Sequence, residues 1–311
     1  MHDVPEIHGR KALVISNPMA GSRRTTLTHD VIHELSIMGW QVSLVRTQSI
    51  GHAEQIVVGL QAQPHGMPDV LIVAGGDGTI NEVVNGLCHI GGLDLPIALI
   101  PTGTVNLLAS EIRLPTNPKL LADIISQSRV GKVVLGQITA GPNSRLFLMT
   151  AGVGFDARAV SRVSKNLKKF DGKFAYIVAG VTEYLFGKWP FYQITIDGES
   201  SCARSVLFAN GRHYAGGMTW APGASIKEPS LEVGVFHRLG RFRLLLYALA
   251  LIMGKLGSMP GVRILSAKEI ELQSHCSDPI QADGDIVGYL PARISVAPTW
   301  VNMIGLEPRS N

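Results

Sequence analysis

The sequence has few cysteines and no hydrophobic run long enough to cross a bilayer. Its 311 residues include three cysteines, Cys88, Cys202 and Cys276. Such a sparse, scattered set indicates free thiols in a reducing compartment, and no pair has the spacing of a metal site. The longest apolar run, Leu244–Met253, has ten residues, whereas a spanning helix needs about 20. We interpret this run as a buried helix, with a membrane anchor as the alternative.

The chain also lacks a strong charge of either sign. Its net charge is +4, with 17% charged and 46% hydrophobic residues, which is typical of a globular protein with room for two cores. A mild positive excess fits an anionic ligand or membrane surface, and we expect no nucleic acid partner. Residues Met1–Glu6 have neither the charged nor the apolar region of a signal peptide, so we expect a cytoplasmic protein, with peripheral membrane association left open.

The first part of the chain alternates strand and helix patterns. Strands are expected at 12–15, 41–46, 70–74 and 97–100, with helices between them and at 105–112. Repeated βα units predict a parallel sheet, which binds ligands beyond the carboxyl ends of its strands.

From about residue 132, short strands separated by turns predict a mainly antiparallel β domain. It is interrupted by helices expected at 157–169, 173–186 and 241–256. We therefore expect domains 1–131 and 132–311, with the last residues able to pack back on the first domain.

The most informative motif is Gly75-Gly76-Asp77-Gly78-Thr79, which joins a predicted strand to a helix. Glycines allow positive φ and close backbone approach, and a helix N-terminus favours phosphate. Asp77 suits Mg²⁺ binding or proton removal from a hydroxyl. The pattern predicts phosphoryl transfer from a nucleotide; a plain glycine-rich turn with a capping Asp is the alternative. Asn81 and Glu82 lie one turn into the helix and can reach back to the loop, although Asn81 also suits helix capping.

Two further loops follow predicted strands of the first domain. The loop Asn17–Gly21, with Pro18, is followed by Arg23 and Arg24, which can pair with phosphate oxygens. The loop Pro101–Asn106 offers Thr hydroxyls and helix N–H groups as another anion site. It should lie beside the glycine turn if the two strands are neighbours.

Two motifs stand out in the second domain. Gly152–Asp156 ends a strand and opens a helix, and Gln281–Asp285 carries Asp283 and Asp285 two positions apart. Such carboxylates can act as base and as metal or nucleotide contact. A type I′ hairpin turn at Asp283-Gly284 is the alternative.

Together these motifs resemble the diacylglycerol kinase catalytic-domain superfamily, and in particular its soluble bacterial lipid kinases, relatives of sphingosine and ceramide kinases. The ordered set NPxAG, GHA, GGDGTxNEVxNGL, PxGTxN, GxGFDA and QADGD runs over residues 10 to 308. The resemblance implies an α/β nucleotide domain like those of phosphofructokinases and NAD kinases, a C-terminal β-sandwich, and an active site in the cleft between them.

The resemblance also implies roles for particular residues. ATP phosphates would lie on the glycine turn and the Asn17–Gly21 loop. The nucleotide pocket would be completed by Thr47, Thr102, Gly103, Thr104 and Asn106. The general base would be Asp285 or Asp77, and both stay open. Asp156, with Gly154, would contact or position the lipid headgroup, and Mg²⁺ would arrive with ATP near Asp77.

The sequence departs from this superfamily at two places. The last turn usually reads Asp-Gly-Glu, whereas here it ends in Asp285, which is one methylene shorter. The acids that hold a structural Mg²⁺ in relatives are replaced in Ala221–Ser230, where Glu228 is the one remaining candidate ligand.

We therefore expect an ATP- and Mg²⁺-dependent lipid kinase. Diacylglycerol is the preferred substrate candidate, and a sphingoid base, ceramide or phosphatidylglycerol are the alternative substrates. A NAD kinase-like enzyme and a catalytically weak nucleotide-binding regulator are the alternatives. A homodimer is left open. The stretch 158–173 carries six basic residues and is expected to face an anionic membrane, or else to be a solvated helix face; these residues are Arg158, Arg162, Lys165, Lys168, Lys169 and Lys173.

Overall fold

The computed structural model describes residues 9–20, 25–62, 66–162, 172–214 and 216–307. The chain divides into two compact units. Unit 1 consists of Met1–Gly103, Ile112–Lys132 and Val301–Asn311, and unit 2 of Thr104–Glu111 and Val133–Trp300. The predicted limits, 1–131 and 132–311, did not separate out residues 104–111, which group with unit 2.

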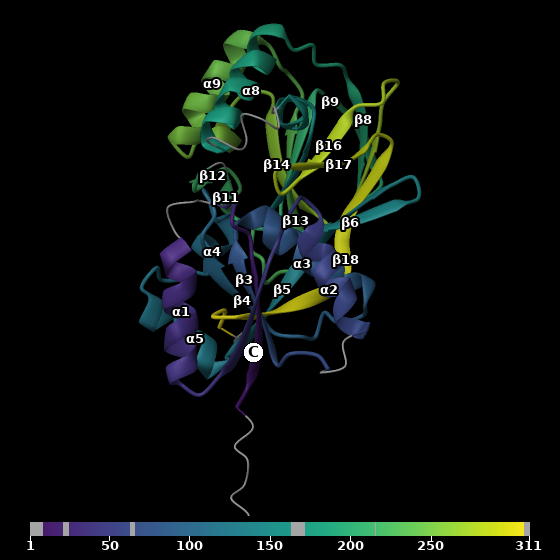
Figure 1. The fold of residues 1–311 in the computed structure, drawn as a ribbon. Coiled ribbons are helices and arrows are strands. Elements are labelled where there is room, and N and C mark those ends of the chain that lie inside the picture. The colour runs from purple at the N-terminus through teal and green to yellow at the C-terminus, as the bar shows by residue number, and fades with distance from the viewer. Residues whose placement is uncertain (1–8, 21–24, 63–65, 163–171, 215, 308–311) are drawn as a thin grey trace, which may run out of the picture. The chain divides into compact units, whose positions relative to one another are not determined.

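Unit 1 is built on a parallel sheet with the strand order β2-β1-β3-β4 (Figure 1). The strands are β1 (Lys11–Ser16), β2 (Gln41–Arg46), β3 (Val70–Gly75) and β4 (Ile97–Pro101). The end of β18 (Ala292–Ile304) adds a further parallel pair, Met303 with Ile97. β3 is buried along its whole length, as expected for a central strand covered on both faces.

Helices cover both faces of this sheet, and Figure 1 shows one pair on each side. α1 (Thr25–Ile37) and α5 (Pro118–Gln127) pack together, as do α2 (His52–Gly59) and α3 (Asp77–His89). A short 3-10 turn, η2 (Leu60–Ala62), follows α2. Asn117 caps the start of α5, because its side-chain oxygen accepts the backbone N–H of Leu120 at 3.1 Å. The core under α1 and α5 includes Val14, Val31, Leu35, Ile72, Ile100 and Leu121.

Unit 2 is an antiparallel β-sandwich, which confirms the predicted fold class. One sheet has the order β14 (Val262–Ala267), β13 (Leu231–Phe236), β10 (Ser205–Ala209), β7 (Thr150–Val153), β16 (Pro279–Ala282) and β17 (Asp285–Tyr289). The other is formed by β18, β15 (Glu269–Gln273), β8 (Tyr192–Ile196), β9 (Glu199–Ala203), β5 (Val130–Ala140) and β6 (Asn143–Phe147). One core cluster takes side chains from both sheets, including Phe147, Tyr192, Phe208, Val233, Ile280 and Ile294.

Unit 2 also carries short connecting elements. These are α4 (Leu107–Glu111), α6 (Phe155–Ser161), η3 (Leu256–Ser258) and the two strands of a small hairpin, β11 (His213–Tyr214) and β12 (Met218–Thr219). The helix predicted at 105–112 is thus a single turn. The helix predicted at 157–169 begins earlier and ends at Ser161, and residues 163–169 of that prediction lie outside the described part of the chain.

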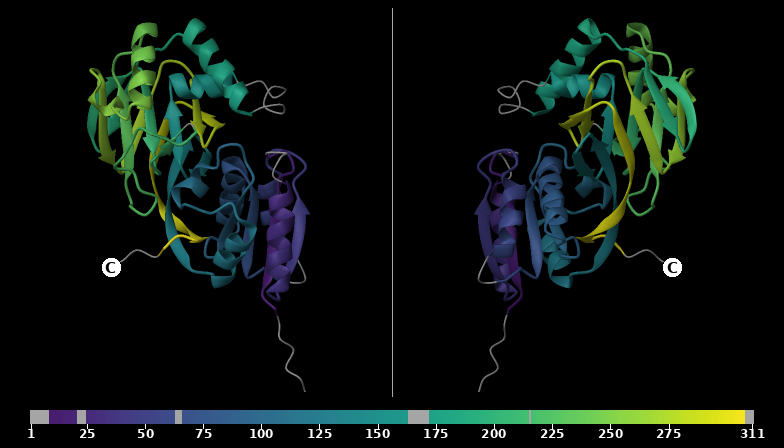
Figure 2. Two further views of the ribbon diagram at one scale, coloured as in Figure 1. Left: turned by 90° about the vertical axis from the view of Figure 1, so that its left-hand side faces the viewer. Right: turned by 90° about the vertical axis from the view of Figure 1, so that its right-hand side faces the viewer.

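Two longer helices, α8 (Gly172–Phe186) and α9 (Arg241–Ile252), lie side by side at one end of unit 2 (Figure 2). Among the described residues, no helix is long and apolar enough to cross a membrane. The prediction that Leu244–Met253 is buried is wrong. α9 buries Tyr247 and Ala250, and Tyr247 packs on Phe236 with ring centroids 5.6 Å apart. Leu244 and Leu251 are partly buried, and its other large apolar side chains are exposed, because a single face of this helix packs against the rest of unit 2.

Candidate functional site

The candidate site is described in two parts, one in each unit. In unit 1, the loops after β1, β3 and β4 meet at the carboxyl ends of these strands. Asn17 donates its Nδ2 hydrogen to Thr79 Oγ1 at 3.1 Å. The backbone N–H groups of Thr102 and Gly103 both lie 3.2 Å from the carbonyl oxygen of Gly75. β3 and β4 are neighbours in the sheet, and the structure thus brings the glycine turn and the Pro101–Asn106 loop side by side as expected.

A pocket of about 280 Å³ opens at this edge of unit 1. It is lined by Ser16, Asn17, Pro18, Ala20, Thr28, His29, Leu44, Arg46 and Thr102. Asn17, Pro18 and Thr102 are among the predicted nucleotide residues, whereas Thr28, His29, Leu44 and Arg46 were not predicted. Arg46 is the last residue of β2, directly before Thr47. Its position at the carboxyl end of a predicted strand could have indicated that it lines the pocket.

One buried hydroxyl in this pocket has no partner. Thr102 is 4% exposed, and its Oγ1 makes no hydrogen bond to any described residue. An unsatisfied buried hydroxyl costs about 1–3 kcal/mol unless a ligand or water completes it. Its place on the pocket wall fits an acceptor or donor group of a bound nucleotide.

Gly76 in the glycine turn has an extended backbone with φ −106°, so positive φ is not the reason for glycine at this position. A Cβ on Gly75 would lie 2.7 Å from the Thr79 side chain, so Gly75 is required by the close fold of the turn onto its own helix. Asp77 is the first residue of α3 and is half-buried. The positive end of the helix stabilises a carboxylate at this position.

The two residues one turn into α3 have structural partners. The carboxylate of Glu82 accepts the backbone N–H groups of Gly51 at 2.8 Å and Ala53 at 3.0 Å. Glu82 thus caps α2 and holds the Gly51–Ala53 loop, whereas its place in the sequence had indicated a reach back to the glycine turn as a nucleotide-binding residue. Asn81 is buried, and its Oδ1 accepts a hydrogen from Asn85 Nδ2 at 3.1 Å. Gly21, Arg23 and Arg24 lie outside the described residues.

In unit 2, Asp283 and Gly284 form a two-residue turn between β16 and β17, with φ of 46° and 88°. Positive φ at both positions is the signature of a type I′ turn, the alternative that the sequence left open. The Asp283 carboxylate accepts three backbone N–H groups, from Leu148 at 2.8 Å, Met149 at 2.9 Å and Thr150 at 3.0 Å. These contacts give Asp283 a structural role in the turn, and its place among the catalytic acids stays a prediction.

Asp285 begins β17 at the end of this turn, and its side chain is exposed. The turn that carries it is tied to α6 by a chain of hydrogen bonds. Gln281 Oε1 accepts the Gly284 N–H at 3.1 Å, and Gln281 Nε2 donates to Asp156 Oδ2 at 2.6 Å. Tyr214 donates its hydroxyl hydrogen to Asp156 Oδ1 at 2.6 Å. The GxGFDA and QADGD motifs thus form one network.

Burial raises the pKa of Asp156, while its hydrogen bonds from Tyr214 and Gln281 oppose that effect. Burial and the neighbouring Asp156 carboxylate likewise raise the pKa of Tyr214 well above its usual value. Both oxygens of Asp156 have protein partners, and through Gln281 the residue is linked to the turn that carries Asp285. Gly154 adopts φ +92° and is buried, and a Cβ there would lie 2.7 Å from the Arg204 carbonyl oxygen. The backbone conformation therefore requires glycine at this position, and the headgroup contact of Gly154 stays a prediction.

Tyr214 was not predicted, and a second network holds the strand that carries it. Glu111, at the end of α4, accepts hydrogen bonds from Arg212 Nε at 3.2 Å and from the backbone N–H groups of Arg212 and His213. His213 Nδ1 lies 2.6 Å from Glu111 Oε2. Within unit 2, Thr104 is exposed and Asn106 is buried with φ 56°.

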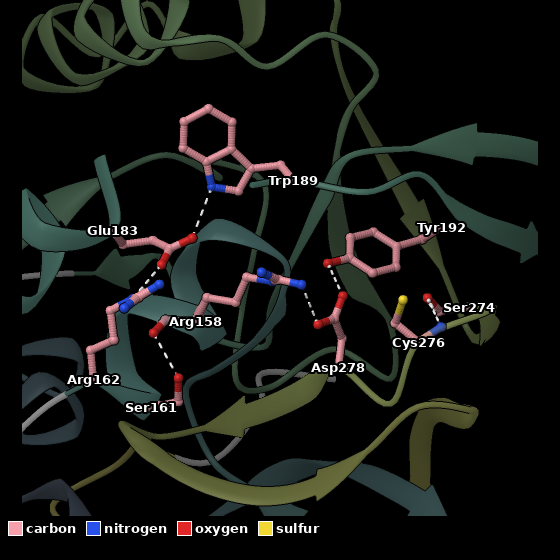
Figure 3. A network of polar contacts seen from close by, with 9 residues as sticks. All are labelled: Arg158, Ser161, Arg162, Glu183, Trp189, Tyr192, Ser274, Cys276 and Asp278. Carbon is pink, nitrogen blue, oxygen red and sulfur yellow. Dashed lines mark hydrogen bonds and ion pairs between the residues drawn. The ribbon is translucent and has the colours of Figure 1, made fainter. Parts of the chain in front are cut away.

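Two of the six basic residues of the stretch 158–173 have described side chains. Arg158 in α6 and Arg162, which directly follows this helix, pair with two buried acids, Asp278 and Glu183 (Figure 3). Each acid has a second donor, Tyr192 at 2.6 Å for Asp278 and Trp189 Nε1 at 3.1 Å for Glu183. Burial is the main cause that raises the pKa of Tyr192. The two arginines neutralise the interior of unit 2; residues 163–171 and the Lys173 side chain lie outside what the structure describes.

Glu228 is the residue that the sequence left as a candidate ligand of a structural metal. Glu228 is exposed in a turn, where its N–H donates to the Ser225 carbonyl at 3.0 Å. Among the described residues, no group of three or more His, Cys, Asp or Glu side chains could hold a metal ion.

Comparison with known proteins identifies the class. The family described as diacylglycerol kinase catalytic domain matches residues 11–138, and the YegS C-terminal NAD kinase beta sandwich-like domain matches residues 149–305. The chain therefore belongs to the diacylglycerol kinase family, and it is a kinase that acts on a lipid.

Individual relatives and structures agree with this assignment. The diacylglycerol kinase of Staphylococcus saprophyticus is 28% identical over 286 residues, 91% of each chain. The diacylglycerol kinase of Mycobacterium tuberculosis is 27% identical over 305 residues, 96% of each chain. A diacylglycerol kinase structure from Bacillus anthracis shares the fold with a TM-score of 0.67 and 21% identity, covering 95% of this chain and 96% of that one.

Proposed function

We propose that this enzyme transfers the γ-phosphoryl group of Mg·ATP to the hydroxyl of diacylglycerol. The observation that carries the nucleotide part is the buried, unpartnered Oγ1 of Thr102 in the pocket beside the glycine turn. Asn17, Gly75, Thr79 and Thr102 would hold the nucleotide, together with the α3 N-terminus, which favours phosphate. ATP supplies the phosphoryl group, and Mg²⁺ neutralises charge on it during transfer.

We assign the general base to Asp285 and the contact with Mg·ATP to Asp77. Asp77 sits at a helix N-terminus, which stabilises its ionised form and makes it a better cation ligand than proton acceptor. Asp283 is held by three backbone donors. Asp285 is the exposed carboxylate of the same turn, and the Gln281–Asp156 chain fixes the backbone that carries it. In this assignment Asp285 takes the proton of the lipid hydroxyl.

The test incubates the purified protein with ATP and an extracted lipid pool and resolves the products by mass. A diacylglycerol product heavier by one phosphoryl group is expected. Phosphorylated sphingoid base, ceramide or phosphatidylglycerol would redirect the substrate within the lipid kinases. Phosphorylation of NAD⁺ without any lipid product would refute the lipid assignment, and nucleotide binding without turnover would indicate a regulator.

A further inference from the structure

α9 presents a continuous apolar stripe to solvent. Phe242 is 74% exposed and Ile252 is 72% exposed, whereas Tyr247 on the opposite face is 5% exposed. The stripe consists of Phe242, Leu245, Leu246, Leu249, Ile252 and Met253. At 3.6 residues per turn these positions occupy an arc of about 120°. One side of the helix therefore holds it to the sheet, and the other side is a band of large apolar side chains.

The neighbouring helix α8 adds a second set of exposed apolar side chains. These are Val178, Val181, Leu185 and Phe186, spaced by three, four and one residues as on one side of a helix. The two helices pack together, and Arg241 Nη2 at the start of α9 donates to the Leu185 carbonyl oxygen at 2.7 Å. Figures 1 and 2 show them as neighbours. We call these two sets of residues the α8–α9 face; exposed apolar groupings of this kind mark interaction sites.

The segment of the chain that contains α9 carries charge of one sign. No acidic residue occurs between Glu232 and Glu269, a segment that contains α9 and six basic residues: Arg238, Arg241, Arg243, Lys255, Arg263 and Lys268. The one acid of α8, Glu183, is fully buried and paired with Arg162. The α8–α9 face thus combines apolar side chains with a positively charged surround.

We propose that the α8–α9 face docks the enzyme onto an anionic lipid bilayer. The inference rests on the proposed function, since diacylglycerol is held in a bilayer. α9 has twelve residues, about 18 Å of helix against a hydrocarbon core of about 30 Å, so it would lie in the plane of the interface. Apolar side chains would enter the boundary of headgroups and acyl chains, and basic side chains would meet lipid phosphates.

The same charges argue against a second copy of the chain as the occupant. A twofold interface through this face would bring each basic surround against itself. Like charges brought together at an interface are unfavourable, whereas an anionic bilayer complements them.

The test compares two double variants in vesicle sedimentation. Leu245→Ser/Leu249→Ser replaces two apolar side chains of the stripe. Ile37→Ser/Leu120→Ser on unit 1 is the matched control, because it also replaces two exposed apolar side chains. The exposed fractions of Leu120, 54%, and Leu249, 52%, are nearly equal. On phosphatidylcholine vesicles containing phosphatidylglycerol, the α9 variant should bind at least about tenfold more weakly than the parent. The control variant should bind like the parent, and parent binding should fall with salt and on purely neutral vesicles.

Activity separates this inference from the proposed function. With dioctanoylglycerol dispersed as monomer, the parent and the α9 variant should turn over equally, whereas on vesicles the α9 variant should lose activity. No lipid product in either format would refute the proposed function, and vesicle sedimentation would still report on docking. Parent-like vesicle binding by Leu245→Ser/Leu249→Ser overturns the docking proposal. So does a parent dimer that this variant dissociates in sedimentation velocity without any loss of vesicle binding.

Discussion

The carboxylate of Asp283 should contribute more to the stability of unit 2 than any other part of the QADGD turn. It receives the backbone N–H groups of Leu148, Met149 and Thr150 at 2.8–3.0 Å, and all three residues are buried. Hydrogen bonds to an ionised acceptor contribute about 1.5–3 kcal/mol each. In Asp283→Asn one oxygen can still accept from Met149 and Thr150, but the amide NH₂ would face the Leu148 N–H, which loses its acceptor. We therefore expect a loss of about 2–4 kcal/mol in the free energy of unfolding.

The backbone of the turn should not contribute to this loss. Asp283 has φ 46°, and Asn tolerates this left-handed conformation as well as Asp does. Asp285→Asn, at the exposed end of the same turn, is the matched control and should shift stability by no more than about 0.5 kcal/mol.

Urea unfolding followed by tryptophan fluorescence measures the effect. The four tryptophans are Trp40, Trp189, Trp220 and Trp300, and only Trp40 belongs to unit 1. A Trp40→Phe background therefore makes the signal specific for unit 2. A lower midpoint at unchanged slope is the expected result. If Asp283→Asn unfolds at the same urea concentration as the parent, the three hydrogen bonds do not stabilise the fold as argued.

Two further predictions concern the acids of the same network. Asp285→Ala should lower turnover by about 10²–10⁴ with little change in ATP affinity, and Asp285→Glu should retain or raise it, because only reach changes; a mild Asp285→Ala defect seen mainly in ATP affinity would move the base to Asp77. Burial raises the pKa of Asp156 in the folded protein, so the folded state binds its proton more tightly than the unfolded state does. The contribution of Asp156 to stability is then greatest below about pH 3.9, its usual pKa, and is lost as pH rises through the raised value. Asp156→Asn removes this titration, so its stability relative to the parent should increase with pH across that window in urea titrations. A difference between the two proteins that does not change with pH would contradict the cause assigned to the shift.

The strand and helix periodicities were sufficient to predict the fold class. The apolar runs at 12–15, 70–74 and 97–100 all form parallel strands of one sheet. Short continuous apolar runs of this kind are typical of strands that helices cover on both faces. The glycine-bearing loops were predictable for the same reason, since each follows a strand and the carboxyl ends of parallel strands share an edge. The hydrogen-bond partner of each polar side chain could not be predicted from the sequence.

Glu82 shows this limit most clearly. Its position one turn into α3 suits a contact with the glycine turn, yet its carboxylate caps α2, which begins about 30 residues earlier in the chain. The packing of α2 on α3 decides the matter, and it depends on Gly86, where a Cβ would lie 2.9 Å from Val57 Cβ. Tyr214 was missed for a related reason, because its two-residue strand has no periodicity and is held by Glu111 through His213 and Arg212.

Two arginines of the basic stretch and the apolar run of α9 differ from the expectation in opposite directions: Arg158 and Arg162 pair with buried acids, whereas much of the apolar run is exposed. An arginine side chain can point into the protein when it pairs with a buried acid. Asp278 pairs with Arg158 in this way, and Glu183 pairs with Arg162. A helix that is apolar on every side can pack only one of its sides against a sheet. Its remaining apolar surface stays exposed unless another apolar partner covers it. In a kinase whose substrate is a lipid, that partner can be the bilayer in which the substrate is dissolved. If the proposed docking holds, Arg238, Arg243 and Lys255 of the segment that contains α9 would add charge attraction to the lipid phosphates, since that segment has no acidic residue between Glu232 and Glu269.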